Sequence, residues 1–179
     1  LYQSAASSLL KIVLAGPDRT FFMPAFQQLR ELRRRINYRP PELEDLTQFN
    51  VASLPEPFQA SFNYFVGEFM SDFGLTVPAV PYLESVKKTS PDHPKARYLL
   101  GIIALQDESL SKVQQARAAS KHFQEAVVSA EAQTNLGVVD LGYIALARLA
   151  YEYGQYDAAI YYYRKISENS TLLADAFYE

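Results

Sequence analysis

The side chains that could support acid–base or metal chemistry are few and lie far apart in the sequence. His93 lies in the segment Pro91-Asp92-His93-Pro94, which is typical of a turn, and His122 lies on a predicted helix beside Phe123. A metal site or an acid–base pair requires several such groups to converge on one pocket. Two isolated histidines on different segments are more typical of surface positions, so we predict that neither is functional.

Two carboxylate clusters could supply a paired acid and base. They are Asp107-Glu108 and the group at residues 42–45, and both fall in predicted loops or at helix ends. Solvated charge is the simpler interpretation, since catalysis needs two carboxyl groups whose surroundings shift their pKa values apart. The sequence has no Gly-rich phosphate loop, no Gly-x-Ser-x-Gly or His-Glu-x-x-His motif, and no cysteine. We therefore predict no catalytic residue, no metal and no cofactor, and not an enzyme.

A basic cluster is the third candidate for chemistry. Arg30, Arg33 and Arg34 share one predicted helix face, with Arg35 beside it, and could contact nucleic acid phosphates or an acidic partner. The alternative is a solvated face near a helix C-terminus, where the helix dipole favours cations. Residues 1–40 hold seven Lys and Arg against two Asp and Glu, whereas the remainder is acidic and the whole chain carries −3. We therefore favour a protein partner over nucleic acid.

The composition favours helices. Hydrophobic residues make up 49% of the chain and glycines number only 7, and few segments alternate apolar and polar residues as strands do. The longest strongly apolar stretch, residues 99–105, is far shorter than the roughly 20 residues that span a bilayer. No signal peptide is visible, and because residue 1 is Leu and the sequence stops at Glu179, we expect it to be part of a longer chain.

An internal repeat is the most informative feature. Residues 62–69 and 96–103 look alike, and their glycines, Gly67 and Gly101, lie 34 residues apart. Ala79, Leu83 and Pro91 follow Gly67 at 12, 16 and 24 residues. A fixed step of this length indicates stacked structural units, each too small to bury its apolar faces alone.

The clearest unit spans residues 141–163 and contains the turn Gly154-Gln155-Tyr156-Asp157 followed by Ala159. With these spacings, residues 60–179 resemble the tetratricopeptide repeat family. The resemblance gives units at about 60–93, 94–133 and 140–173 and the start of another at 174–179. The middle unit fits only with about six residues inserted around 106–112, and a similar excess follows Ala126. Longer helices or a protruding loop would absorb them.

The resemblance implies an all-α fold in which antiparallel helix pairs stack as an α-solenoid, or right-handed superhelix. Small residues should lie where the two helices of a pair cross closely, and one turn later large side chains should fill the gap to the next unit. The expected small residues are Gly67, Gly101 and Ala147 on first helices and Ala79, Ala119 and Ala159 on second helices, and the expected large ones are Leu83, Phe123 and Tyr163.

Local signals outline the remaining helices. Ser111 and Gln114 have the spacing of a capping box, and Thr76 is a candidate N-cap. Residues 1–54 have helical spacing on both sides of Gly16-Pro17-Asp18 and a short predicted helix at 42–49. We therefore expect an N-terminal helical region at 1–54, in the form of a degenerate repeat, and a repeat array at 55–179, with the softest boundary at 50–57.

In tetratricopeptide repeats the first helix of each unit lines a concave groove that binds protein or peptide. Tyrosine suits such a surface because it offers contact area, a polar tip and little rotamer entropy to lose. The family's Lys/Asn/Arg clamp for chaperone C-termini is absent, because Tyr64 and Glu68 stand where it needs Lys and Asn. The groove positions carried over are Ser61, Tyr64, Glu68, Ser71 and Asp72, then Lys95, Tyr98, Ile102, Leu105 and Gln106, then Leu141, Ile144, Arg148, Tyr151 and Glu152, and finally Asp175 and Tyr178.

The predicted function is a scaffold that holds a peptide or protein surface in this groove. Two alternatives stay open: a helical accessory or catalytic domain of an enzyme, and a structural segment whose groove is filled by its own chain. A helix from residues 1–54 in the groove would indicate the latter. Residues 172–179 are expected to form a helix docked on 160–166, leaving an apolar edge that could support self-association. Resemblance to bacterial envelope repeat proteins suggests the periplasm.

Overall fold

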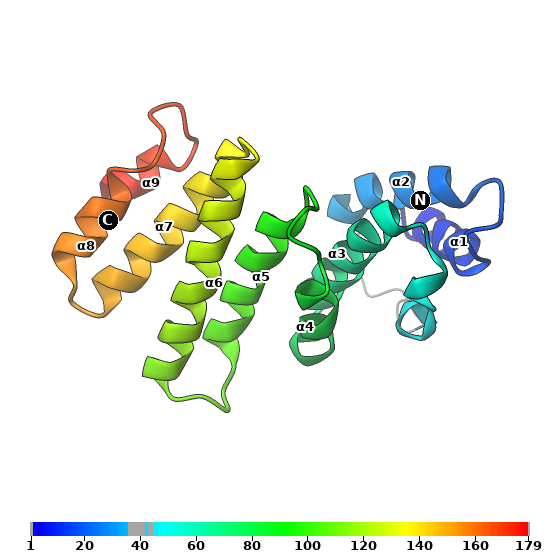
Figure 1. Cartoon of the computed structure of the whole chain (residues 1–179), viewed down its shortest axis with the longest axis horizontal. Helices are drawn as coiled ribbons and strands as arrows, with labels where there is room; N and C mark the ends of the chain where they lie inside the picture. Colours follow the sequence, from blue (N-terminus) through cyan, green and yellow to red (C-terminus); the bar gives the residue numbers. More distant parts are fainter. Residues whose placement is uncertain (1, 36–41, 43–44, 179) are drawn as a thin grey trace. The chain divides into compact units, whose positions relative to one another are not determined.

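The structure is a computed structural model that describes residues 2–35, 42 and 45–178. Within these residues the chain is entirely helical, with α-helices joined by turns and short 3₁₀ segments and no strand (Figure 1). The expected all-α class is therefore confirmed. None of the described helices combines the length and apolar composition needed to cross a bilayer.

The chain divides into two compact units, Leu1–Ser85 and Val86–Glu179. The repeat boundaries drawn from the sequence stay predictions. The first unit contains α1 (Tyr2–Leu14), α2 (Phe22–Leu32), η1 (Arg33–Arg35), η3 (Asp45–Gln48), η4 (Val51–Ser53), α3 (Glu56–Asp72) and α4 (Thr76–Glu84). The second contains α5 (His93–Gln106), α6 (Lys112–Ala132), α7 (Leu136–Glu152), α8 (Tyr156–Tyr163) and α9 (Leu173–Tyr178).

Aromatic packing forms the core of the first unit. The helices α1 and α2, which lie on the two sides of Gly16-Pro17-Asp18 as expected, pack together. Phe26 of α2 lies 4.5 Å from Phe58 and 5.3 Å from Phe65, both on α3, measured between ring centroids. Phe22 makes a similar edge contact with Phe58 at 5.2 Å. These rings are buried, so the N-terminal helices share a core with α3.

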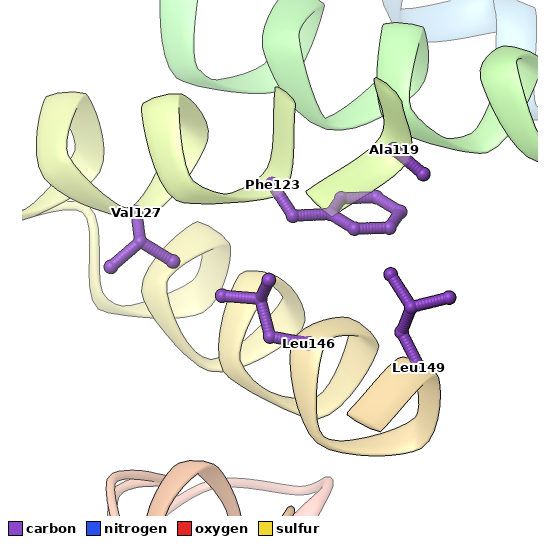
Figure 2. Close-up of a cluster of buried hydrophobic side chains, with 5 residues drawn as sticks. All are labelled: Ala119, Phe123, Val127, Leu146 and Leu149. Carbon is purple, nitrogen blue, oxygen red and sulfur yellow. The ribbon is translucent and has the colours of Figure 1, made fainter. Parts of the chain in front are cut away.

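In the second unit each helix packs on the next from α5 to α8, and α5 also contacts α7. Figure 2 shows the centre of this unit, where Ala119, Phe123 and Val127 of α6 face Leu146 and Leu149 of α7. All five side chains are buried. Neither helix could bury these residues alone, so the two helices depend on each other for their apolar contacts.

Close crossings are present at two of the expected glycines, but the side chains that contact them are Leu83 and Phe123, which were expected to fill the gap to the next unit. A Cβ atom placed on Gly67 would lie 2.6 Å from Cγ of Leu83 and 3.3 Å from the Ala79 carbonyl oxygen. A Cβ placed on Gly101 would lie 2.4 Å from Cε1 of Phe123. At both positions the large side chain of the second helix rests directly on the glycine backbone of the first.

One close approach was not predicted. A Cβ on Gly142 of α7 would lie 2.4 Å from Cγ2 of Val127 on α6. Gly142 therefore serves the contact between successive helix pairs, not the contact within a pair. At the third predicted crossing, Ala147 and Ala159 are both buried on α7 and α8, which pack together.

The six extra residues of the middle unit are shared between a loop and a helix. The loop 107–111 is two residues longer than the loop 73–75, and α6 begins seven residues before Ala119, whereas α4 begins three before Ala79. The later excess lengthens α6 to Ala132.

The expected capping box is confirmed. Gln114 N–H donates to the Ser111 hydroxyl, and Ser111 N–H donates to the Gln114 side chain at 2.9 Å. The expected Thr76 cap is wrong, because Leu75 occupies the N-cap and no side chain caps α4.

Candidate functional site

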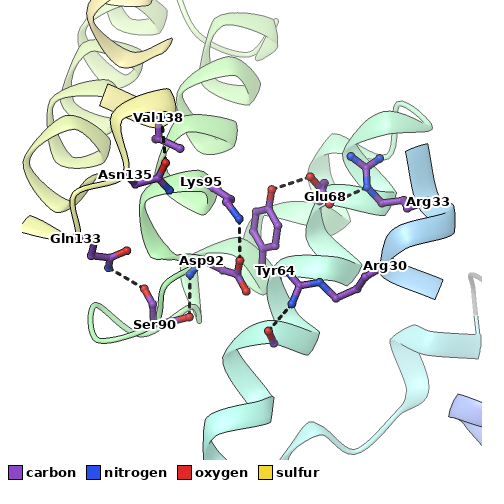
Figure 3. A network of polar contacts seen from close by, with 11 residues as sticks. Arg30, Arg33, Tyr64, Glu68, Ser90, Asp92, Lys95, Gln133, Asn135 and Val138 are labelled. Atoms are coloured by element: carbon purple, nitrogen blue, oxygen red, sulfur yellow. Dashed lines mark hydrogen bonds and ion pairs between the residues drawn. The ribbon is translucent and has the colours of Figure 1, made fainter. Parts of the chain in front are cut away.

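On α3, several of the predicted groove residues bind side chains of α2 and η1 (Figure 3). Arg33 Nε lies 2.7 Å from Glu68 Oε2, and Arg33 Nη1 also pairs with Asp72. Arg30 Nη1 donates to the Ser61 hydroxyl at 2.7 Å. Three of the predicted groove positions in the first unit are thus in contact with arginines from residues 1–54. This is the observation expected for a groove filled by its own chain.

The burial of Tyr64 corrects its predicted role. Its side chain is only 6% exposed, and its hydroxyl donates to Glu68 Oε1 at 2.6 Å. Tyr64 therefore offers little of the contact area that the groove prediction assigned to it. Together with Arg33 it supplies two donors to one carboxylate, an arrangement that fixes the Glu68 side chain.

The arginine cluster also differs from both interpretations of the sequence. Arg33 is 16% exposed at its side chain, so it is neither a solvated cation nor an open phosphate contact. Arg35 donates to the Tyr2 hydroxyl at 3.2 Å and its guanidinium lies 5.5 Å from the centre of that ring. The side chain of Arg34 lies outside the description. The described arginines of the cluster thus bind groups of their own unit.

On α5, the predicted groove residues are partly buried or paired with other residues of the second unit. Lys95 pairs with Asp92 at 3.3 Å, at the start of its own helix (Figure 3). The Tyr98 ring packs 5.5 Å from that of Phe123, and Ile102 is half-buried against the same cluster. Burial raises the pKa of the Tyr98 hydroxyl, and the charge of Arg148 on α7 acts in the opposite direction. The placement of Tyr98 and Arg148 on one groove surface stays a prediction.

On α7, one predicted position is buried and three are exposed. Ile144 is only 2% exposed, so it cannot offer the contact area assigned to it. The reason is that α7 contacts α5, α6 and α8, which together cover more of its circumference than an edge helix would have covered. Arg148, Tyr151 and Glu152 lie exposed near the C-terminal end of α7, and Tyr151 is 53% exposed.

An apolar cleft of about 490 Å³ lies beside Tyr151. The Tyr151 and Tyr156 rings meet edge to face at 5.5 Å, and Ile160 continues the surface along α8. The helix expected over residues 172–179 is present as α9 (Leu173–Tyr178), with Glu179 outside the described residues, and the apolar edge beyond it stays a prediction. Residues of α7, α8 and α9 line the cleft: Tyr151, Tyr156, Ala159, Ile160, Tyr163, Arg164, Ile166, Glu168, Leu173 and Ala176.

One of the two histidines is not at the surface, where both were expected. His93 is 2% exposed as the first residue of α5, and its Nδ1 lies 2.9 Å from the Val86 carbonyl oxygen. Burial is the main reason that its pKa is lowered. His122 lies on α6, half-buried. Among the described residues, no group of three or more His, Asp or Glu side chains could hold a metal ion.

Comparison with protein-family models, with curated proteins and with solved structures finds no match to this chain.

Proposed function

We propose that this chain is a tetratricopeptide-like repeat protein, built as an α-solenoid, that binds a protein or an extended peptide. The observation that carries the architecture is the pair of close crossings at Gly67 and Gly101, 34 residues apart, each under a large side chain of the following helix. Two helix pairs with the same contact at the same step are typical of repeated units.

The contact surface that we propose is the exposed side of α5 and α7 in the second unit. It combines Arg148, Tyr151 and Glu152 with the half-buried Tyr98. An exposed tyrosine between charges of both signs suits recognition of a peptide, because the ring supplies area and the charges set orientation.

In the first unit, the contacts of Arg30 and Arg33 with α3 favour a different role. There the corresponding face is engaged by the chain itself, so we assign it a structural function. The binding function then belongs to the second unit alone. The proposal therefore differs from the sequence prediction, in which every repeat contributed residues to the groove.

A peptide-library selection on the full chain tests the proposal. Peptides enriched on the wild-type chain should bind the Arg148→Ala/Tyr151→Ala variant at least about tenfold more weakly in fluorescence anisotropy, which corresponds to about 1.4 kcal/mol. Phe21→Ala is the matched control, since Phe21 is an aromatic residue of the first unit that is 70% exposed. Failure to enrich any peptide, or equal affinity for wild type and double variant, would refute the proposed surface.

A further inference from the structure

The outer face of α8 is unusually apolar for a short helix. Its inner side buries Ala159, whereas Tyr156, Ile160 and Tyr161 are 60%, 49% and 56% exposed. The first two line the cleft beside Tyr151. Exposed large apolar residues gathered on one helix indicate a surface that another structure covers.

The equivalent face of α6 lies beside helices of the same unit. Aligning Phe123 with Tyr163 pairs Ala116 with Tyr156 and Ser120 with Ile160, forty residues apart. Ala116 and Ser120 line a cleft whose other walls are Leu149 and Ala150 of α7 and Ala158 and Tyr162 of α8. The structure thus contains one example in which two following helices line this face of a helix. On α8, Leu173 and Ala176 of α9 line the corresponding cleft.

The charges on α8 identify what would fit its outer face. Asp157 lies at its N-terminal end, and Arg164 and Lys165 follow its C-terminal end. Residues 156, 160 and 164 recur every four positions, as do 157, 161 and 165, so both rows lie along one side of the helix. The apolar residues Ile160 and Tyr161 stand between the two charged ends.

This pattern is complementary to itself only in the antiparallel direction. Reversing the helix about the midpoint between Ile160 and Tyr161 exchanges position 157 with 164 and position 156 with 165. The carboxylate of each copy would then face the cations of the other, and the apolar centres would meet. A parallel arrangement would place like charges together, which is unfavourable.

We propose that the outer face of α8 docks a second copy of this chain through antiparallel α8–α8 pairing. A twofold interface of this kind is isologous, so one surface serves both partners. The helix has 8 residues and is about 12 Å long, so the contact is small and the dimer weak and rapidly reversible. The pairing does not require Arg148 or Glu152 of the peptide surface proposed above, although the two surfaces adjoin at Tyr151, which lines the cleft with Tyr156 and Ile160.

Sedimentation velocity of the full chain from about 5 to about 500 µM, a range that brackets micromolar dissociation constants, is the first measurement. Wild-type protein should shift from monomer to dimer within this range. Asp157→Arg makes the face wholly basic, and Arg164→Asp/Lys165→Asp makes it wholly acidic. Each variant alone should lose at least about tenfold in dimer affinity, and an equimolar mixture of the two should form a heterodimer.

The control is Asp18→Arg, the same charge reversal at an exposed residue of the first unit, which should leave dimerisation unchanged. Circular dichroism of each variant establishes that the helices remain folded, and heterodimer formation in the mixture shows that both mutated faces remain competent. A wild-type chain that stays monomeric throughout the range would overturn the proposal. So would a dimer that both charge variants leave intact, since another surface would then be responsible.

Discussion

Adding a single methyl group at Gly101 should separate the steric role of this glycine from its effect on the helix backbone. In Gly101→Ala the new Cβ would lie 2.4, 2.6 and 2.9 Å from Cε1, Cδ1 and Cζ of Phe123. Overpacking of this kind typically costs about 1–3 kcal/mol. The higher helix propensity of alanine returns about 0.5–1 kcal/mol. We therefore expect a net loss of about 0–2.5 kcal/mol in the free energy of unfolding.

Gly137→Ala supplies the matched control. Gly137 also lies in a helix, α7, but its nearest neighbour to a new Cβ is 4.0 Å away at Asn135 Oδ1. This substitution should stabilise the chain by up to about 0.5–1 kcal/mol, because only the backbone effect remains. The difference between the two variants in urea melts followed by circular dichroism isolates the steric cost at Gly101.

A double-mutant cycle with Phe123→Leu completes the test. Leucine lacks the ring atoms that the new Cβ would meet, so Gly101→Ala should cost less in the Phe123→Leu background than in wild type. We expect a coupling energy of about 0.5–3 kcal/mol, the range for residues in direct contact. If Gly101→Ala instead stabilised the chain as Gly137→Ala does, the ring of Phe123 could not rest on Gly101 and the crossing would be wrong.

Four further substitutions test the fold and its charges. Arg33→Ala should lower the free energy of unfolding by about 1–2 kcal/mol in urea melts, because charge-assisted hydrogen bonds are lost. The loss should be smaller at high salt, which screens these charges. A loss that salt does not alter would contradict this explanation. Ser111→Ala should cost about 1 kcal/mol in the same melts because the cap is removed, and an unchanged midpoint would argue against the capping box. Burial and the Glu131 hydrogen bond raise the pKa of Tyr143 to about 12, so its contribution to stability is complete below about pH 10 and is lost between pH 10 and 12. Ultraviolet titration of Tyr143→Phe should therefore lack the absorbance change of one tyrosine that ionises near pH 12 in the wild-type chain. Burial lowers the pKa of His93, so the free energy of unfolding should fall as the pH decreases below about 6.5. Thermal melts at several pH values should show a smaller loss of stability in acid for His93→Gln than for the wild-type chain.

The close crossings could be predicted because their sequence signal is local and steric. A glycine leaves room for a large side chain on the facing helix, and the 34-residue step located Gly67 and Gly101 without knowledge of any other contact. The Ser111 cap is predictable for a similar reason, since both partners lie within four residues. Gly142 escaped prediction because it lies outside the 34-residue step and meets Val127 of a preceding helix pair.

The exposure of the groove positions was harder to predict than the crossings, because exposure depends on which helices lie next to each residue. Transferring the groove positions assumed that every first helix has the same neighbours. The α3 face instead receives Arg30 and Arg33 from the preceding segment, and α7 is contacted by three other helices, which buries Ile144. His93 is a similar case, since its turn was expected but its bond to the Val86 carbonyl is a tertiary detail.

These differences favour the second unit as the one that contacts partners. Charged side chains that could engage a ligand on α3 already pair with arginines of their own unit. On α7 and α8, by contrast, Tyr151, Tyr156, Ile160 and Tyr161 expose about half or more of their surface. Keeping such residues in water forgoes the stabilisation that burial of roughly 25 cal/mol per Å² of apolar area would supply. A partner that covers them recovers this free energy, and the two proposed surfaces divide them: a peptide beside Arg148 and Tyr151, and a second copy of α8 over Ile160 and Tyr161.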